Sequence, residues 1–503
     1  TISNEEDTNN TLDTTYLKYK LVSNDGYDSG IKRLKDIGTG TYRIVDERAL
    51  LKSKNITYKL YIWIASDAPN SIQNKIYKSK IIVSSISNRV GDTYCLDNGF
   101  TKLSDCMLVL NNHEATTDIA KTNIKSKGTP DFSKTATTDE GLFMAEDDEG
   151  ESYYYRGAVK NNYVSFAGFI WRIIRRNGDG SIRMIYSGKK TSDTGEDVTI
   201  GNSQFNSKYW DPTYVGYKYN EDFELHENNE TKGYNWFTNT SKYNYGTGYT
   251  FDTSTKKFTL TGTIKQLTWK DNHDEIVKNQ LYSCLETSCN VMYKITGYSN
   301  DITMIVQPIS YSSKSLATAQ TNNTNSAIKI TIDNWYKNNM INYTSKLADE
   351  TFCNDRSISR GTGYKTGTYT FYGAYNRNLD RKVPSLKCTQ DNDKFKLSNS
   401  SAKLDYPVAL ITVDELAMAG GVYGVSNNNF YLYNGLYQWS FSPGHFGPDY
   451  SHARVWHIDS FGGLSPGHRV TLSFGVRPVI NLKSDTLIRK GDGSALSPFV
   501  VES

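Results

Sequence analysis

The residue types most able to do chemistry gather near the C-terminus. Four of the seven histidines lie there with two aspartates among them: His445, Asp449, His452, His457, Asp459 and His468. Imidazole and carboxylate groups can bind a metal ion, but their spacing here is neither that of an HExxH motif nor that of ligands one helical turn apart. We therefore expect no metal ion and no other cofactor. Scattered surface histidines and a contact surface remain as interpretations, and the second is favoured.

Two further motifs suggest chemistry that their surroundings do not support. The sequence GLSPG at residues 463–467 matches the GxSxG pattern of a nucleophilic serine, which needs a helix directly after the serine. Pro466 follows Ser465 at once, and HRVTLSF beyond it is typical of a strand. The acidic run AEDDEGE at residues 145–151 lacks the DxDxDG arrangement of a calcium loop. We predict a solvated acidic loop there and no enzymatic activity for the chain.

What remains is a concentration of aromatic and polar side chains in the loops of the C-terminal region. Such side chains offer a large contact area at a low entropic cost, and binding loops on rigid scaffolds are rich in them. Trp439 and Trp456 lie in strand-like segments and are expected in the core. The predicted ligand-binding residues are His445, Phe446, Asp449, Tyr450, His457, Asp459, Phe461 and His468.

The six cysteines fall into three local pairs: Cys95 with Cys106, Cys284 with Cys289, and Cys353 with Cys388. None of these spacings is that of a zinc site. Free buried thiols are one interpretation. An even number of cysteines in local pairs favours three disulfides between neighbours, and hence an oxidising, extracellular setting.

Composition limits the partners. The chain has 503 residues, which predicts two or three domains, and 37% of them are hydrophobic and 13% aromatic. There are 57 basic and 54 acidic side chains, for a net charge of +3. With no global basic field, we expect no nucleic-acid partner, and no apolar stretch is long enough for a membrane span. The chain begins at Thr1 rather than Met, so we expect a processed N-terminus.

Strand and helix patterns divide the chain into three parts. Strand-like runs at 16–22, 56–64 and 77–86 predict a β-sandwich assembly domain at residues 1–92. Residues 93–151 are interpreted as a disulfide-closed connector, and residues 152–503 as the ligand-binding domain. Within the last part, NGDGS at 177–181 predicts a turn between two strands, and Thr412 and Glu415 stand at the spacing of a capping box. Helical spacing joins Ile328, Ile332, Trp335, Tyr336 and Met340.

The order of motifs between residues 163 and 483 is similar to a known family. Six motifs follow one another in this order: WRIIRRNGDGSIRMI, IDNWYKNN, LITVDEL, WSFSP, ARVWHIDSFGGL and GVRPVINL. This order resembles the C-type-lectin-like domains of the formylglycine-generating-enzyme type in surface proteins of gut Firmicutes. Some of those are variable proteins of diversity-generating retroelements, which implies ligand contacts and variation within residues 442–474. No cysteine lies beyond Cys388, so the resemblance does not imply the cysteine chemistry of formylglycine-generating enzymes.

Residues 56–83 resemble, over a shorter stretch, the β-sandwich of camelysin/TasA-type secreted fibre proteins, which implies self-assembly through the N-terminal domain. The expected fold class is therefore α+β and β-rich, with an N-terminal β-sandwich and a large C-type-lectin-like domain that carries insertions. We expect an extracellular bacterial adhesin or filament (fimbrial) subunit. Its partner would be a host-cell or bacterial-surface protein or a glycan. The alternatives are an extracellular hydrolase and a phage tail receptor-binding protein.

Overall fold

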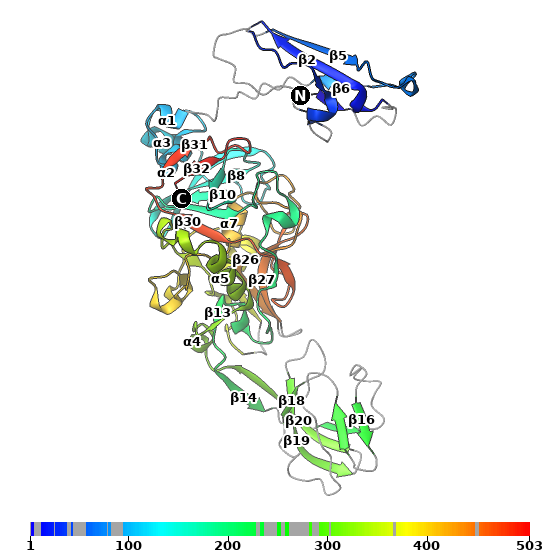
Figure 1. Ribbon diagram of the computed structural model, residues 1–503. Helices are drawn as coiled ribbons and strands as arrows, with labels where there is room; N and C mark the ends of the chain where they lie inside the picture. The colour runs from blue at the N-terminus through cyan, green and yellow to red at the C-terminus, as the bar shows by residue number, and fades with distance from the viewer. Residues whose placement is uncertain are drawn as a thin grey trace. The chain divides into compact units, whose positions relative to one another are not determined.

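The computed structural model describes most of the chain: residues 2–4, 12–24, 26–37, 42–43, 57–77, 79–81, 94–227, 232–235, 249–252, 257–260, 281–283, 291–300, 303–365, 369–447 and 452–502. The chain forms two compact units, Thr1–Thr93 and Tyr94–Ser503. Both are built mainly from strands with few helices, so the coarse prediction of a β-rich α+β protein is confirmed (Figure 1). Each unit is described by itself.

In the first unit, the described residues form two small sheets. One has the strand order β4-β1-β6 and the other β3-β2-β5. The central strand of the second sheet alternates as expected for a half-buried strand, with Leu17, Tyr19 and Leu21 buried. The strand bounds are β1 (Ile2–Asn4), β2 (Leu17–Ser23), β3 (Lys32–Arg33), β4 (Tyr42–Arg43), β5 (Tyr58–Ile64) and β6 (Ser79–Ile81), with short helical turns η1 (Thr14–Tyr16), η2 (Leu34–Ile37) and η3 (Asn70–Ile72).

The second unit contains, within its described residues, an eight-stranded sheet of order β30-β11-β10-β9-β32-β31, to which β8 and β7 add beside β10. The predicted Asp-Gly turn joins β10 to β11, which pair antiparallel. The last strand, β32, pairs in parallel with β9, so strands more than three hundred residues apart lie side by side in one sheet. The end of the unit lies beside its cyan N-terminal part in Figure 1. The strands are β7 (Asp139–Asp147), β8 (Gly150–Gly157), β9 (Tyr163–Phe166), β10 (Phe169–Arg176), β11 (Ile182–Tyr186), β30 (Val479–Leu482), β31 (Ile488–Lys490) and β32 (Phe499–Val501).

A second sheet carries the C-terminal motifs. Its order is β12-β29-β26-β24-β23, with β27 paired to β26 and β28 paired to β27. The long strand β26 bulges at Pro443, where its pairing register with β27 shifts. The strands are β12 (Asn202–Gln204), β23 (Ile358–Arg360), β24 (Thr370–Tyr372), β26 (Gln438–Gly447), β27 (His452–Ile458), β28 (Leu464–Ser465) and β29 (Ser473–Gly475).

Smaller sheets complete the described strands. Among them, β16 pairs antiparallel with β17. The remaining strands are β13 (Lys218–Tyr219), β14 (Phe223–Glu227), β15 (Lys232–Asn235), β16 (Tyr249–Asp252), β17 (Lys257–Leu260), β18 (Leu281–Ser283), β19 (Val291–Asn300), β20 (Thr303–Ser313), β21 (Thr324–Asn325), β22 (Phe352–Cys353) and β25 (Lys394–Phe395).

The helices of the second unit are short, and both predicted ones are present. Helix α5 buries Ile328, Ile332 and Tyr336 at helical spacing. Helix α7 begins with the predicted capping box, in which Thr412 and Glu415 each accept from the other's backbone N–H. The α-helices are α1 (Tyr94–Asp97), α2 (Leu103–Val109), α3 (Thr117–Ser126), α4 (Leu316–Ala319), α5 (Ala327–Asn339), α6 (Gly373–Tyr375) and α7 (Val413–Met418).

Shorter 3-10 and π turns lie between these elements: η4 (Gly195–Val198), η5 (Pro212–Val215), η6 (Ile341–Lys346), η7 (Asn376–Arg381), η8 (Asp391–Asp393) and η9 (Ser400–Ala402). In the part of the chain that is described, no helix combines the length and the apolar character that crossing a bilayer would need.

Residues 94–151 belong to the second unit, although the sequence suggests a separate connector there. Cys95, Leu103 and Met107 are buried in the same hydrophobic core as Trp171 of β10. Strand β7 pairs with β8, and the backbone of Leu103 donates to the carbonyl of Thr486 near the end of the chain. The apolar face of α2 needs a partner to bury it, and the main sheet supplies that partner.

Candidate functional site

The predicted contact residues begin on β26, whose side chains alternate between two environments. His445 lies opposite Phe371 of β24 and Arg454 of β27, whereas Phe446 lies opposite Thr370 and Ala453. Directly opposed residues of an antiparallel pair share one face of the sheet. Phe446, Thr370 and Ala453 are all fully buried, so they form the inner face. Phe446 therefore packs in the core in this structure.

The opposite face carries a group of stacked rings, which we call the aromatic patch. His445 stacks on Phe371 at 5.5 Å between ring centroids and meets the edge of Tyr375 at 5.6 Å. Tyr369 stacks on Phe371 at 6.2 Å, and the guanidinium of Arg360 lies 4.0 Å from the Phe371 centroid. The patch consists of Arg360, Tyr369, Phe371, Tyr375, Lys382, Tyr423 and His445.

Trp456 lies beneath the patch and supports it. Its ring is fully buried and contacts Tyr375 at 6.3 Å and Tyr423 at 6.1 Å. The ammonium of Lys382 lies 5.2 Å from the Tyr423 ring. Tyr369 and Tyr423 are 44% and 39% exposed, so the upper part of the patch faces solvent while its base is buried.

The imidazole of His445 is neutral at physiological pH. Burial first, and then the neighbouring charge of Arg454, lower its pKa to about 4. Its buried Nδ1 has no hydrogen-bond partner among the described residues. A neutral ring can stack on Phe371 without the desolvation cost of a cation.

A second group of rings surrounds His457 on the other face of β27. The imidazoles of His457 and His468 are 4.7 Å apart, and Tyr437 contacts both of them. His457 is 1% exposed, and burial together with the charge of His468 lowers its pKa to about 3. His468 is partly exposed and Tyr437 is 37% exposed. These side chains form a small aromatic cluster with only its rim at the surface.

Asp459 and Phe461 occupy the turn after β27. One carboxylate oxygen of Asp459 accepts from the backbone N–H groups of Phe461, at 2.8 Å, and Gly463, at 2.9 Å. Phe461 is 67% exposed at the tip of this turn. Asp459 thus shapes the loop, and Phe461 projects from it. Asp449 and Tyr450 lie outside the described residues.

The structure thus divides the predicted residues into separate groups. His445 belongs to the aromatic patch, His457 and His468 to the ring cluster, and Phe461 to a turn. Trp456, expected in the core, and His457, predicted to bind a ligand, are both buried, because separate sets of rings cover the two faces of β27. Trp439 and Trp456 are 2% and 0% exposed, which confirms them as core residues.

Sequence reasoning missed most of the aromatic patch. Phe371 and Tyr375 come from a segment more than sixty residues before His445, and Tyr423 comes from the loop after α7. A signal was present in the run YTFYGAY at residues 369–375, where four aromatic residues stand close together. Nothing in one sequence shows that this run pairs with β26.

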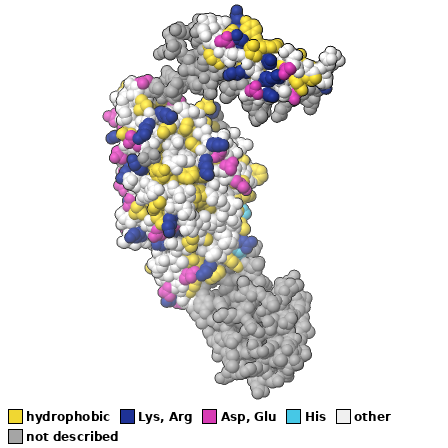
Figure 2. Space-filling model, viewed as in Figure 1, with side chains coloured by type: hydrophobic (Ala, Val, Ile, Leu, Met, Phe, Trp, Pro, Cys, Tyr) yellow, Lys and Arg dark blue, Asp and Glu magenta, His cyan; other side chains and the backbone are white. Residues whose placement is uncertain are grey.

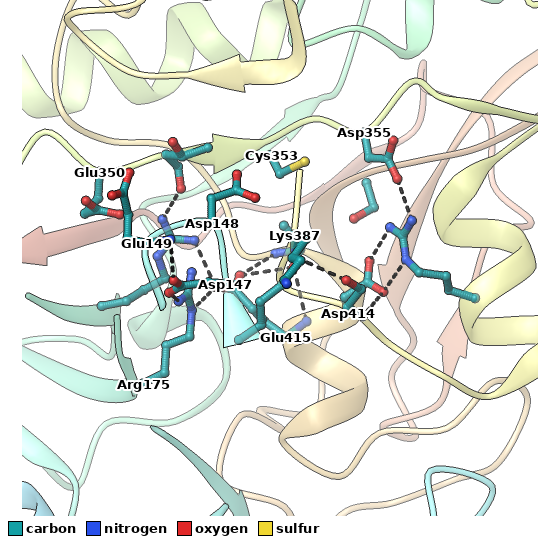
Figure 3. Close-up of a pocket in the computed structure, with 17 residues that line it drawn as sticks. Asp147, Asp148, Glu149, Arg175, Glu350, Cys353, Asp355, Lys387, Asp414 and Glu415 are labelled. Atoms are coloured by element: carbon teal, nitrogen blue, oxygen red, sulfur yellow. Dashed lines mark hydrogen bonds and ion pairs between the residues drawn. The ribbon is translucent and has the colours of Figure 1, made fainter. Parts of the chain in front are cut away.

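A pocket lined by charged side chains lies at the N-terminal end of α7 (Figure 3). Arg175 of β10 bonds Asp147 at 2.7 Å and Glu415 at 3.1 Å, and Arg183 of β11 bonds the same oxygen of Glu415 at 2.9 Å. Burial raises the pKa of Glu415, but the two guanidinium groups outweigh it and bring that pKa down to about 2. The capping carboxylate of α7 therefore also anchors the helix to the main sheet.

The other side of the pocket is held by Arg377. Its guanidinium bonds both carboxylate oxygens of Asp414 at 2.9 Å and one oxygen of Asp355 at 2.7 Å. Glu350 differs from these residues: it is 9% exposed and has no hydrogen bond or ion pair within the described part of the chain. The open space is about 30 Å³, enough for ordered water molecules or one small ion.

Two of the three predicted disulfides are present. Cys95 pairs with Cys106 in the core of the second unit, and Cys353 pairs with Cys388 beside the charged pocket. This confirms both pairings between neighbours. Cys284 and Cys289 lie outside the described residues.

The GLSPG motif and the acidic run at residues 145–151 both make hydrogen bonds that hold local structure. The hydroxyl of Ser465, in the GLSPG motif, accepts from the backbone of Gly467 at 3.1 Å, and the described residues after it form β29 rather than a helix. Asp147, in the acidic run, bonds Arg175 and the backbone of Gly178. No set of three His, Cys, Asp or Glu side chains in the described ranges has an arrangement that could hold a metal ion.

Charge is mixed over the surface. On the face shown in Figure 2, basic and acidic side chains of the second unit are interspersed rather than gathered by sign.

Comparison with known proteins gave no match to a family model, to a curated protein or to a solved structure.

Proposed function

We propose that this chain is a secreted surface protein that binds a ligand through the aromatic patch of its second unit. The observation that carries the proposal is a set of partly exposed rings fixed from below by a buried tryptophan, with Arg360 at one end and Lys382 at the other. Tyr, Trp and Arg dominate the residues that contribute most to protein–protein binding. Rings held by packing lose little entropy when a ligand covers them.

The ligand that suits this surface best is a protein on a host or bacterial cell. The patch is a partly exposed layer of aromatic rings that contact one another edge-on or by stacking. These contacts leave ring faces and tyrosine hydroxyls free to bind a partner. An adhesin is the role that agrees with the resemblance to C-type-lectin-like surface domains. Two disulfides are compatible with the extracellular location that an adhesin needs.

The charged pocket gives no support to the hydrolase alternative. Its open space of about 30 Å³ admits water but not a substrate, and most of its carboxylates already bond arginine.

The test is cell binding by a triple variant. Labelled protein carrying Tyr369→Ala, Phe371→Ala and Tyr423→Ala should lose binding to intact epithelial or Gram-positive cells, as measured by flow cytometry. A matched control replaces three exposed apolar residues elsewhere, Ile119, Ile341 and Leu496, by Ala. The control should bind like the original protein.

Mild protease treatment of the target cells separates the two ligand classes. A protein ligand predicts that treatment removes the binding that depends on the patch. Binding that resists protease but is lost in the triple variant would point to a glycan on the patch. Binding that survives in the triple variant, with an unchanged melting temperature, would refute the patch as the ligand site.

A further inference from the structure

A groove outside the aromatic patch has the features of a small-molecule site. It lies between the end of β11, the loop that contains η4, and helix α5, and its volume is about 490 Å³. This volume falls within the range of roughly 300–1,000 Å³ that is typical of ligand pockets. None of the residues that line it is among the predicted ligand-binding residues.

One wall of the groove is aromatic. Tyr186 and Trp335 line it with their rings 5.7 Å apart and nearly perpendicular. Phe169 packs against both rings, at 5.6 Å and 5.7 Å, and holds them in place. Trp335 is partly exposed, so a ligand in the groove can contact its indole ring. Perpendicular rings leave one ring face free for an apolar surface of a ligand.

Two polar groups on this wall lack protein partners. Tyr186 is 5% exposed, yet its hydroxyl makes no hydrogen bond within the described residues, and the indole N–H of Trp335 makes none there either. Neither atom is among the enclosed polar atoms that lack a partner, so both can bond a molecule in the groove. The indole N–H can only donate, so it needs an acceptor.

The rim of the groove is acidic. Asp193, Glu196 and Asp197 line it against a single basic residue, Lys189. Asp193 holds the loop in place, because its carboxylate accepts hydrogen bonds from the backbone N–H groups of Lys189 and Lys190. Glu196 and Asp197 are exposed and have no ion pair within the described ranges. Burial, and then the charges of Asp193 and Asp197, raise the pKa of the Tyr186 hydroxyl, which shows that these carboxylates lie near it.

These features together define what the ligand must offer. It needs an acceptor for the indole N–H, donors for the free carboxylates, an apolar face for the indole ring, and no negative charge. A cation such as a polyamine would satisfy the carboxylates but would leave the indole N–H without an acceptor. An acidic sugar would be repelled by the rim. A neutral sugar meets all four requirements, since each hydroxyl both donates and accepts.

We propose that this groove is a binding site for a neutral carbohydrate, separate from the aromatic patch. Trp335 would stack on the C–H face of one sugar ring. The Tyr186 hydroxyl, the indole N–H and the carboxylates of Glu196 and Asp197 would bond the sugar hydroxyls.

The experiment is ligand-observed NMR with the full chain and six probes. The neutral probes are chitotriose, maltotriose, cellotriose and mannotriose, and the charged probes are 3′-sialyllactose and spermidine. At least one neutral trisaccharide should bind at millimolar concentration, and neither charged probe should. Tyr186→Phe removes only the hydroxyl and should weaken that binding by about three- to tenfold. Trp335→Ala should abolish it, whereas the control Tyr437→Phe and the triple patch variant should leave it unchanged.

The charge of the rim gives a second, independent readout. The double variant Glu196→Gln, Asp197→Asn keeps hydrogen-bonding groups but removes the repulsion, so it should bind 3′-sialyllactose. This measurement stands even if Trp335→Ala folds poorly. The proposal is overturned if no neutral trisaccharide binds, if spermidine alone binds, or if Tyr186→Phe and Trp335→Ala both bind sugar as well as the original protein.

Discussion

Glu350 makes the stability of the second unit depend on pH in a way that one substitution can isolate. Its carboxyl is 9% exposed in the charged pocket and has no partner among the described residues. Burial, and then the charge of Asp179, raise its pKa from the ordinary 4.5 to about 7, although Arg183 and Lys396 act in the opposite direction. The folded chain therefore holds a proton on Glu350 that the unfolded chain releases.

The sign of the effect follows from this difference. Because the folded pKa is the higher one, the stabilisation is fully present below about pH 4.5 and is lost as the pH rises to about 7 and beyond. A pKa difference of about 2.5 corresponds to about 3 kcal/mol of unfolding free energy. Glu350→Gln carries no titrating group and keeps the shape of the side chain, so the variant should escape this loss.

The measurement is urea unfolding of the full chain between pH 4.5 and pH 8, followed by tryptophan fluorescence. Trp63 is the single tryptophan in residues 1–93, so the signal reports chiefly on the second unit. The stability of Glu350→Gln relative to the original protein should rise by about 3 kcal/mol across this range. Glu149→Gln, an exposed carboxylate at the same pocket, is the matched control and should follow the original profile. Parallel profiles for the original protein and Glu350→Gln would refute the reasoning.

The remaining predictions concern other parts of the chain. His457, buried with a pKa of about 3, binds a proton more weakly when folded than when unfolded, so stability should fall as pH drops below about 6.5, and His457→Gln should lack this loss in acid denaturation scans. Replacing Cys353 and Cys388 by Ala should cost about 4 kcal/mol in urea unfolding, and replacing Cys95 and Cys106 about 3 kcal/mol, because the first pair closes the longer loop; equal costs would contradict the loop argument. Non-reducing peptide mapping should also recover a Cys284–Cys289 link. Deleting residues 1–15 should abolish any filaments seen by electron microscopy, and unchanged filaments would exclude strand exchange through that arm.

Local patterns in the sequence predicted local structure well. The capping box at Thr412, the helical spacing in α5 and the Asp-Gly turn before β11 each depend on residues close in the chain, so the pattern contains the whole interaction. The two described disulfides join cysteines 11 and 35 residues apart, and neighbour pairing was enough to find them.

What the sequence could not reveal are contacts between distant segments. The pairing of β9 with β32 joins residues more than three hundred positions apart, and no periodicity encodes it. His457 is predicted at a ligand-binding surface, yet Tyr437, His468 and Phe474 cover its face of β27. Similarly, Glu350 is unpaired because the two nearby guanidinium groups, those of Arg175 and Arg183, form their ion pairs with Glu415 instead. No local pattern in the sequence indicates that choice of partner.

The parallel pairing of β9 with β32 has a consequence for how the protein is made. The main sheet lacks this strand until residues 499–501 have left the ribosome, and the helices that follow Tyr94 meet residues 486–488 through the Leu103 and Ile488 backbone bonds. The second unit therefore completes its main sheet only after residue 501 has been synthesised. The backbone bonds of Leu103 and Ile488 place the first helices of the unit beside its last strands, so new termini could be opened at a turn such as Ala167–Gly168 and the two ends of the unit joined by a linker.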